Sequence, residues 1–375
     1  MPNCAIICEY NPLHNGHLRL LNAARELAGD GAVVCLMSGN FVQRGEPALL
    51  HRLDRAAAAL ACGADIVLEL PLTVSIASAE AYAGGGVRIL RELGGMDYLC
   101  FGSECGDAQR LTATAAALQS PEFAAHLRTQ LDAKLPFAAA RQAALEELCG
   151  DGSILASPND ILAVEYCKAL RGSDVAPWTL RREGAYHGGS DPSQPSASWL
   201  RANPDDWAER MPEAALELQQ PAARYGYAYG ERAVLARLRT LTDAEWEALP
   251  YGGEGLWRRV MTAARTGCSL DEILTTAATK RYPHARLRRM LLSAFLGITA
   301  GDLSAPAPYV RLLGFRPGGQ VLLRQWRKAE LPVIHTGEPG PDAAYQALET
   351  RADALFALCA ERIAPQRTER VLRMG

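Results

Sequence analysis

The sequence has no long apolar run and no targeting segment. None of its 375 residues lies in an uninterrupted apolar stretch of the roughly 18–20 residues that a bilayer-spanning helix needs. The first residues, Met1 to Cys4, lack the basic-then-apolar layout of a secretory signal peptide. These absences predict a cytoplasmic protein without membrane spans, and the chain length predicts two or three domains.

Paired cysteines are also lacking. The chain has 10 cysteines but no Cys-x-x-Cys pair, so neither a zinc site nor a disulfide framework is indicated. Cys4, Cys8 and Cys35 lie in apolar, strand-like runs, where a free cysteine behaves as a small hydrophobic residue. We therefore expect reduced thiols and no bound structural metal.

A strong excess of one charge is missing as well. The formal net charge is -3 at pH 7, which excludes a uniformly basic coat for nucleic acid. A local basic face is still possible, because charges on a protein surface act over about 10 Å at physiological salt.

Short apolar runs alternate with helix-like stretches over the first half of the chain. Such an order predicts an α/β fold with a Rossmann-like parallel sheet and right-handed crossovers. Ligands of such sheets bind beyond the carboxyl ends of the strands. Strand signals fade beyond about residue 205, so we expect an α/β domain over residues 1–204 and a mainly helical domain over residues 205–375. The expected strands are 4–8, 32–37, 66–70, 98–101 and 179–182.

The clearest motif is His14-Asn15-Gly16-His17, which directly follows the first expected strand and opens a helix. A helix N-terminus presents free N–H groups that favour phosphate. Gly16 leaves room for a nucleotide near the backbone, and two imidazoles three residues apart can stabilise charge developing on a phosphorus atom. A pair of hydrogen-bonded interior histidines and a zinc site are the alternatives.

Three further clusters suit the same chemistry. The stretch 196–201 follows a loop rich in Gly, Ser and Pro and offers Arg201 as a cation on a closing loop; a plain helix cap is the alternative. The loop 38–46 should reach the ligand-binding edge with its polar side chains Ser38, Asn40, Gln43 and Arg44; a solvated loop is the alternative.

The last cluster is basic. In a helix expected around residues 279–290, Arg281, His284 and Arg288 share one face, and apolar residues share another. This face could follow an RNA backbone, or it could be an ordinary charged surface. The substrate-binding candidates in this cluster are Lys280, Arg281, His284, Arg286 and Arg288.

The order of these motifs resembles the bacterial tRNA(Met) cytidine acetate ligase family, within the His-x-Gly-His nucleotidyltransferase superfamily. The similar segments are residues 9–17, 37–47, 63–71, 101–105, 157–159, 186–187, 279–282 with Arg286, and 309–315. This sequence departs from the family pattern in places, with Leu13, Asp160, Trp199 and Arg52 replacing the more usual residues.

The resemblance implies an enzyme that activates acetate with ATP to acetyl-adenylate. It then transfers the acetyl group to N4 of the wobble cytidine of elongator tRNA(Met), with Mg²⁺ expected beside ATP. His14 and His17 are the expected catalytic residues. The residues expected to bind ATP are Ile7, Cys8, Glu9, Tyr10, Asn11, Pro12, Leu13, His14, Asn15, Gly16, His17, Leu18, Arg19, Leu20, Gly102, Asn159 and Arg182, together with Arg201.

Two other functions are compatible with the motif. One is a small-molecule adenylyltransferase, which would not need the C-terminal 170 or so residues. The other is a non-catalytic tRNA-binding protein on the same fold, which would not need the intact pair of histidines.

Overall fold

The structure is a computed structural model that describes residues 1–182, 196–279 and 281–375. Lys280, the 186–187 pair and the whole of the loop that precedes residue 196 lie outside the described residues. Within the described residues, no helix is long and apolar enough to cross a membrane.

A mixed, mostly parallel sheet forms the centre of the molecule. In the described parts of the chain it has eight strands, in the order β10-β8-β5-β2-β1-β6-β7, with β9 paired to β8. β8 runs antiparallel to β5, and the other pairs are parallel. The strands are β1 (Cys4–Cys8), β2 (Val33–Ser38), β5 (Ile66–Leu70), β6 (Tyr98–Ser103), β7 (Ala176–Arg181), β8 (Val310–Phe315), β9 (Val333–His335) and β10 (Leu372–Arg373).

The central strands are buried on both faces, because helices cover each side of the sheet. All five residues of β1 are buried. Ala5 and Ile7 pack into one apolar cluster, and Cys4, Ile6 and Cys8 pack into another. This alternation explains the uninterrupted apolar runs. All 10 cysteines are free thiols, as the sequence predicts.

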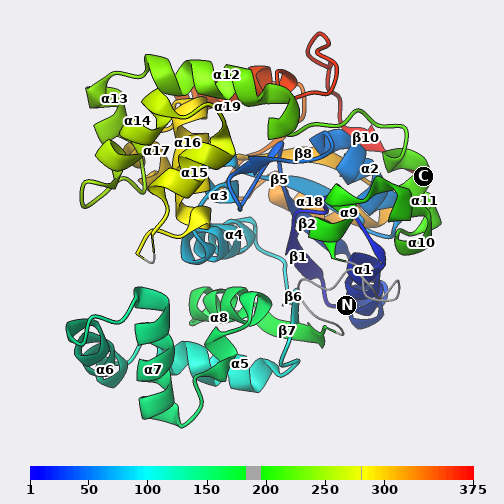
Figure 1. Ribbon diagram of the computed structural model, residues 1–375. Coiled ribbons are helices and arrows are strands. Elements are labelled where there is room, and N and C mark those ends of the chain that lie inside the picture. Colours follow the sequence, from blue (N-terminus) through cyan, green and yellow to red (C-terminus); the bar gives the residue numbers. More distant parts are fainter. Residues whose placement is uncertain (183–195, 280) are drawn as a thin grey trace.

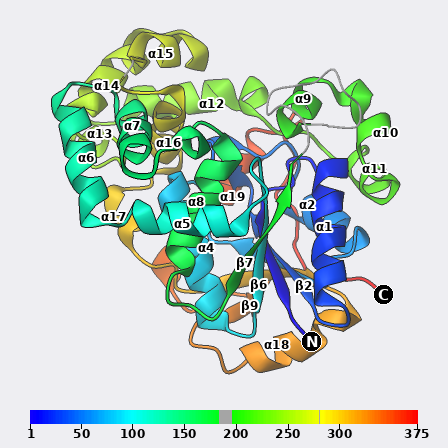
Figure 2. The same ribbon diagram turned by 90° about the horizontal axis from the view of Figure 1, so that it is seen from below.

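Helices from the first half of the chain flank this sheet. Figures 1 and 2 both show α1, α2 and α9–α11 on one side and α4–α8 on the other. The helices are α1 (Asn15–Ala28), α2 (Arg52–Ala61), α3 (Leu72–Ser75), α4 (Ala79–Leu93), α5 (Ala108–Ala117), α6 (Pro121–Asp132), α7 (Phe137–Cys149), α8 (Pro158–Leu170), α9 (Ala197–Ala202), α10 (Trp207–Arg210) and α11 (Glu213–Gln219).

The second half contributes a helical group with its own apolar core. The buried residues of α12, α14, α15 and α16 pack together with α19, and Phe41 and Ile76 of the first half join them. The group comprises α12 (Tyr227–Thr240), α13 (Asp243–Glu247), α14 (Leu256–Thr266), α15 (Leu270–Ala277), α16 (His284–Leu296), α17 (Ala300–Ser304) and α19 (Ala343–Ala357). Figure 1 shows α12–α17 beside α4.

The chain returns to the sheet after this group. β8, β9 and β10 all come from beyond residue 305, and α18 (Gln320–Trp326) packs its Leu322 and Trp326 into the core of the first half. The division at residue 204 thus stays a prediction, but the sheet also draws on the C-terminal segment. The sequence analysis did not predict these strands. β9 and β10, with 3 and 2 residues, are too short to give a strand pattern, and β8 is the only one of the three that is longer.

Candidate active site

Two histidines build the start of α1. His14 is the residue at the N-terminal cap, and its extended backbone lets its ring turn back onto the helix. Its Nδ1 accepts the N–H of Gly16 at 3.1 Å, and Nδ1 of His17 accepts the N–H of His14 at 3.3 Å. The pair therefore forms a capping box in which imidazoles replace the usual hydroxyl and carboxylate.

The stacking of the two rings fixes their orientation. Their centroids lie 3.7 Å apart with an interplanar angle of 22°. A β-carbon on Gly16 would lie only 3.0 Å from His14 Cε1, so the absence of a side chain at position 16 leaves room for the His14 ring. Because Nδ1 of each ring accepts a backbone N–H, the proton of each neutral ring lies on Nε2. Each ring thus keeps one N–H donor.

Both histidines are neutral in the folded protein. Burial lowers the pKa of His14 well below its usual value, and the neighbouring His17 and Arg182 lower it further. Burial and Arg182 lower the pKa of His17 to about 3, against a small opposing effect of the Pro12 carbonyl. Neutral imidazoles that donate from Nε2 suit an anionic ligand without carrying a charge of their own.

Gly102, Arg182 and Asn159 come together beside this motif. Gly102 lies on β6, Arg182 follows β7, and Asn159 lies in the first turn of α8. A β-carbon on Gly102 would be 3.2 Å from Arg182 Cγ, so this glycine lets the arginine side chain pass over the strand. Arg182 Nη1 donates to Asn159 Oδ1 at 3.5 Å. Burial lowers the pKa of Arg182, and among the described residues it has no ion-pair partner within 4.0 Å.

Glu104 and Asp160 connect β6 to α8. Glu104 accepts from Asn159 Nδ2 at 2.6 Å and from the N–H of Asp160 at 2.8 Å. Asp160 in turn accepts the N–H groups of Glu104 and Cys105 at 2.8 and 3.1 Å. The cap residue of α8 is Ser157. The side chains of Asn159 and Asp160 bind the end of β6, because the sheet brings it within reach.

A single cavity of about 710 Å³ joins these parts. Its wall includes Gly102, Asn159 and Arg182, and it also includes the first turn of α16 with His284, Ala285, Arg288 and Arg289. The histidine motif and the end of β1 lie along the same cavity. The sequence-predicted residues that line it are Ile7, Cys8, Glu9, Tyr10, His14, Gly16, His17, Arg19, Leu20, Gly102, Asn159, Arg182, Gln43, Arg44, His284 and Arg288.

The remaining candidates lie outside the cavity wall. Arg201 donates to the carbonyl of Asn11 at 2.9 Å and to Ser198 Oγ at 3.3 Å. The bond to Asn11 fixes the turn before His14. Ser196 caps α9 by accepting the N–H of Trp199. The candidates that do not line the cavity are Asn11, Pro12, Leu13, Asn15, Leu18, Arg201, Ser38, Asn40, Arg281 and Arg286.

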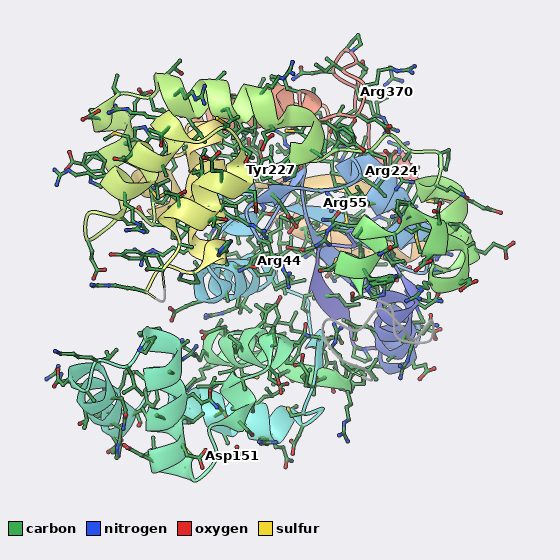
Figure 3. The ribbon with its side chains drawn as sticks, in the orientation of Figure 1. Arg44, Arg55, Asp151, Arg224, Tyr227 and Arg370 are labelled. Carbon is green, nitrogen blue, oxygen red and sulfur yellow. The ribbon has the colours of Figure 1, made fainter. Side chains whose placement is uncertain are left out.

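The 38–46 loop divides its side chains between two tasks. Gln43 and Arg44 line the cavity, and Figure 3 shows Arg44 near the centre of the molecule. Asn40 instead donates to Asp353 at 3.0 Å and accepts the N–H of Arg52 at 3.0 Å. Ser38 is fully buried, and its Oγ has no hydrogen-bond partner in the structure. Only part of the loop therefore belongs to the site.

Arg55 holds this loop in position, and the sequence analysis did not identify it as a candidate site residue. Its side chain is completely buried and donates to the carbonyls of Leu50 at 3.0 Å, Glu9 at 2.6 Å and Ser38 at 3.0 Å, and also to Gly39. Burial lowers the pKa of Arg55 to about 10. Arg55, labelled in Figure 3, thereby holds the ends of β1 and β2 next to each other. Its position in an alanine-rich helix gave no signal of this role.

The basic cluster is reorganised at the start of α16. The helix begins at His284, so Arg281 precedes it and pairs with Glu254 at 2.7 Å. The prediction of one helical face that includes Arg281 is therefore wrong, because Pro283 caps the helix. Arg286 donates to the carbonyl of Tyr251 at 3.0 Å. Arg289 lines the cavity and Arg286 does not; the sequence analysis had not named Arg289.

Gly45 brings α16 against the loop. Its φ of 78° is a left-handed conformation that favours glycine. A β-carbon there would lie 2.6 Å from the backbone nitrogen of Arg289. Tyr227 also donates to the Gly45 carbonyl at 3.0 Å. This close contact explains how a helix from the second half of the chain completes a cavity of the first half.

Comparisons with known proteins agree with this arrangement. A family model described as HIGH Nucleotidyl Transferase matches residues 1–370. A tRNA(Met) cytidine acetate ligase of Acetivibrio thermocellus is 36% identical over 88% of this chain and 86% of its own length. The ligase of the same name from Clostridium tetani is 32% identical over 96% of each chain. The chain belongs to the tRNA(Met) cytidine acetate ligase family.

Solved structures of the family have the same fold. The crystal structure of Thermotoga maritima TmcAL bound with alpha-thio ATP superposes with a TM-score of 0.88 at 28% identity, over 100% of both chains. The apo form of the same protein gives a TM-score of 0.89. An α/β nucleotidyltransferase fold with a helical C-terminal part, predicted from the motif order, is thereby confirmed.

Proposed function

We propose that this chain activates acetate with ATP to acetyl-adenylate and transfers the acetyl group to N4 of the wobble cytidine in elongator tRNA(Met). The observation that carries the proposal is the continuous cavity between the histidine motif and the basic start of α16. A nucleotide site and an RNA-facing helix then share one space. Relatives named as tRNA(Met) cytidine acetate ligases over most of this chain support the same activity.

The first step takes place at the histidine motif. Acetate attacks the α-phosphorus of ATP, an acyl–phosphate bond forms, and pyrophosphate leaves. The Nε2–H donors of His14 and His17 stabilise the negative charge that grows on the α-phosphate oxygens. Arg182, which has no carboxylate partner of its own among the described residues, provides the cation for the phosphates.

The other residues position the substrates. Gly102 and Asn159, held by Glu104 and Asp160, take the adenosine end of ATP. Gln43 and Arg44 face the acyl group and the cytidine. Arg288, with His284 and Arg289, contacts the tRNA, whose phosphates attract a basic turn. Arg201 keeps the motif turn in place through Asn11.

Magnesium has no evident site in the protein itself. Within residues 1–182, 196–279 and 281–375, no group of three or more histidine, cysteine or acidic side chains could hold a metal ion. A magnesium ion would therefore bind chiefly through the triphosphate and water, as it does in many nucleotide sites. No step above depends on it. Because the tRNA substrate is cytoplasmic, we place the reaction there.

Incubation of the purified protein with ATP, labelled acetate and bacterial tRNA, followed by nucleoside analysis, tests the function. We expect N4-acetylcytidine in tRNA(Met) alone and acetate-dependent ATP–pyrophosphate exchange. Exchange with another acid and no labelled tRNA would point to a small-molecule adenylyltransferase. Binding of tRNA without exchange would point to a non-catalytic binding protein. Either result would refute the proposal.

A further inference from the structure

Glu9 belongs to the cavity wall, and one oxygen of its carboxylate has no hydrogen bond among the described residues. Glu9 directly follows β1 and lines the cavity. Its Oε1 accepts the N–H of Gln43 at 2.9 Å. Among the described residues, this is the only hydrogen bond to the carboxylate, and no cation lies within 4.0 Å of it. Oε2 is thus available to a ligand.

Glu9 shares the cavity wall with the two groups of residues proposed for the two substrates. This wall includes Gly102 and Asn159, proposed for adenosine, and the basic turn of α16, proposed for tRNA. Gln43, whose N–H binds Glu9, and Tyr82 line it as well. The acetyl group of acetyl-adenylate and the N4 amine of cytidine must come together within this cavity, since one is bound to AMP and the other to tRNA.

A second polar group near Glu9 also lacks a partner. Tyr166 is 2% exposed and lines the cavity, and its hydroxyl has no hydrogen-bond partner among the described residues. Leaving a buried hydroxyl unpaired costs about 1–3 kcal/mol, so such groups are usually bound to something. A carboxylate oxygen and a phenol that both lack partners in one cavity indicate a polar ligand there.

A purely structural role accounts for only part of these observations. The bond from Gln43 holds the 38–46 loop against the end of β1. An amide or a hydroxyl would serve equally well for this bond. A carboxylate that has no ion-pair partner within 4.0 Å among the described residues costs free energy in a partly buried position. Its charge therefore has another use.

We propose that Glu9 accepts a hydrogen bond from N4 of the target cytidine and takes up its proton during acetyl transfer. This proposal rests on the function proposed above. Acidic side chains are the usual acceptors for the N4 amine of cytosine. Because the lone pair of that amine is delocalised into the ring, the nitrogen is a weak nucleophile, and removal of its proton as the bond forms is a large advantage.

The step balances as follows. The N4 lone pair attacks the carbonyl carbon of acetyl-adenylate, a C–N bond forms, and the acyl C–O bond to phosphate breaks. AMP leaves with the bonding electron pair. The N4 proton passes to Glu9 Oε2 and then to solvent. No oxidant or further reactant is needed.

The surroundings of Glu9 make its carboxylate a stronger base than that of an ordinary glutamate. Burial raises its pKa above the usual value, against the lowering effects of the Gln43 N–H, Arg201 and Arg44. The rate of acetyl transfer should therefore rise with pH as Glu9 loses its proton. The charged and titratable groups that face it are Arg201, Arg44, Arg55, Glu46, Cys8, Tyr82 and Tyr166.

The test is E9Q, measured separately in the two half-reactions. Glutamine keeps an oxygen for the N–H of Gln43 but cannot take up a proton. The matched control is E26Q, because Glu26 is an exposed carboxylate on α1. Acetate-dependent ATP–pyrophosphate exchange reports on adenylation, and single-turnover transfer from synthetic acetyl-adenylate to tRNA(Met) reports on the second step alone.

We expect E9Q to slow transfer by about 10²–10⁴-fold, the range for loss of a general base, and to slow exchange by a much smaller factor. It should also lose the rise of the rate with pH, while E26Q behaves like wild type in both assays. Transfer by E9Q at the wild-type rate would overturn the proposal. An equal loss of exchange and transfer would also overturn it, because Glu9 would then only shape the adenylation site. Absence of exchange in the wild type would instead refute the proposed function.

Discussion

The active-site cavity and the junction between α2 and α19 handle buried charge in opposite ways. At the junction, Arg52 donates to Glu69 at 3.1 Å, to Asp353 at 2.7 Å and to Glu369 at 2.8 Å. In the cavity, Arg182 and Glu9 have no ion-pair partner within 4.0 Å among the described residues. One region satisfies its charges internally, and the other leaves them for a substrate.

The pKa shifts follow from this difference. Burial alone would lower the pKa of Arg52, but its three carboxylates raise it well above the usual value. Burial lowers the pKa of Arg182, since only the more distant Glu104 opposes the shift. Paired charges therefore serve to hold segments that are far apart in the sequence. In our proposal, the unpaired Arg182 and Glu9 instead contact the substrates, at a cost in stability that ligand binding offsets.

The largest expected effect is on the junction. R52A removes the cation from the buried Glu69 and from the partly buried Asp353 and Glu369, and it should lower the free energy of unfolding by about 3–5 kcal/mol. Urea denaturation measures this. R370A is the control, because Arg370 is exposed (Figure 3) and its loss should change stability by less than about 0.5 kcal/mol. A variant R52A as stable as wild type would show that the junction is not what holds the C-terminal segment.

The next effect belongs to the cavity and should spare stability. H17A removes one Nε2–H donor and should lower the rate of adenylation by about 10²–10³-fold, with ATP affinity nearly unchanged. H126A serves as control, because the His126 side chain is 40% exposed on α6. Pre-steady-state adenylation and equilibrium binding of ATP separate the two quantities. Equal losses in rate and affinity would contradict a role in the transition state.

Acid should reveal the same histidine through stability. The folded pKa of His17 is about 3, against 6.5 for an ordinary histidine. The unfolded chain therefore binds a proton below pH 6.5 that the folded chain does not bind until about pH 3. The stability from this group is complete above pH 6.5 and is lost as the pH falls toward 3, by at most about 1.4 kcal/mol per pH unit.

H17Q isolates this contribution, because glutamine does not titrate. Urea denaturation at several pH values between 6.5 and 4 should give a shallower decline for H17Q than for wild type. Parallel declines in the two proteins would mean that His17 is protonated as easily in the folded state as in the unfolded one.

The smallest effect is expected on tRNA binding by the first turn of α16. R288Q should weaken tRNA binding only modestly, and it should reduce the slope of log affinity against log salt concentration by about 0.7–0.9, the value for one phosphate contact. R128Q on α6 is the matched control, since Arg128 is exposed on a helix that does not line the cavity. Salt titrations of tRNA binding measure both. An unchanged slope for R288Q would remove α16 from the RNA interface.

Sequence patterns anticipated the elements with strong local signals. β1 and β5 were predicted with their bounds, and β2 and β6 nearly so, because each is a buried apolar run. The histidine motif was placed correctly at the start of a helix. By contrast, β9 and β10 have only 3 and 2 residues. Such short strands carry no periodicity, and pairing with an existing sheet is what makes them strands.

Side-chain partners were harder to anticipate than elements. The sequence did place Asn159 at the site, yet it did not reveal that Glu104 and Asp160 hold it. Nor did it show that Arg55 donates hydrogen bonds to backbone carbonyls at the ends of two strands. These partners come from different segments, and no local pattern records which side chains a sheet will bring together.

The sequence alone determined the α/β class, the position of His14 and His17 on a strand-to-helix turn, and the family. These depend on local spacing and hydrophobic periodicity, which a linear string contains. Tertiary structure decided that α16 completes the cavity, that Arg52 joins the C-terminal segment to α2, and that the Glu9 carboxylate is left without a cation. Those facts depend on distances between segments up to 317 residues apart, and such distances are set only when the chain packs.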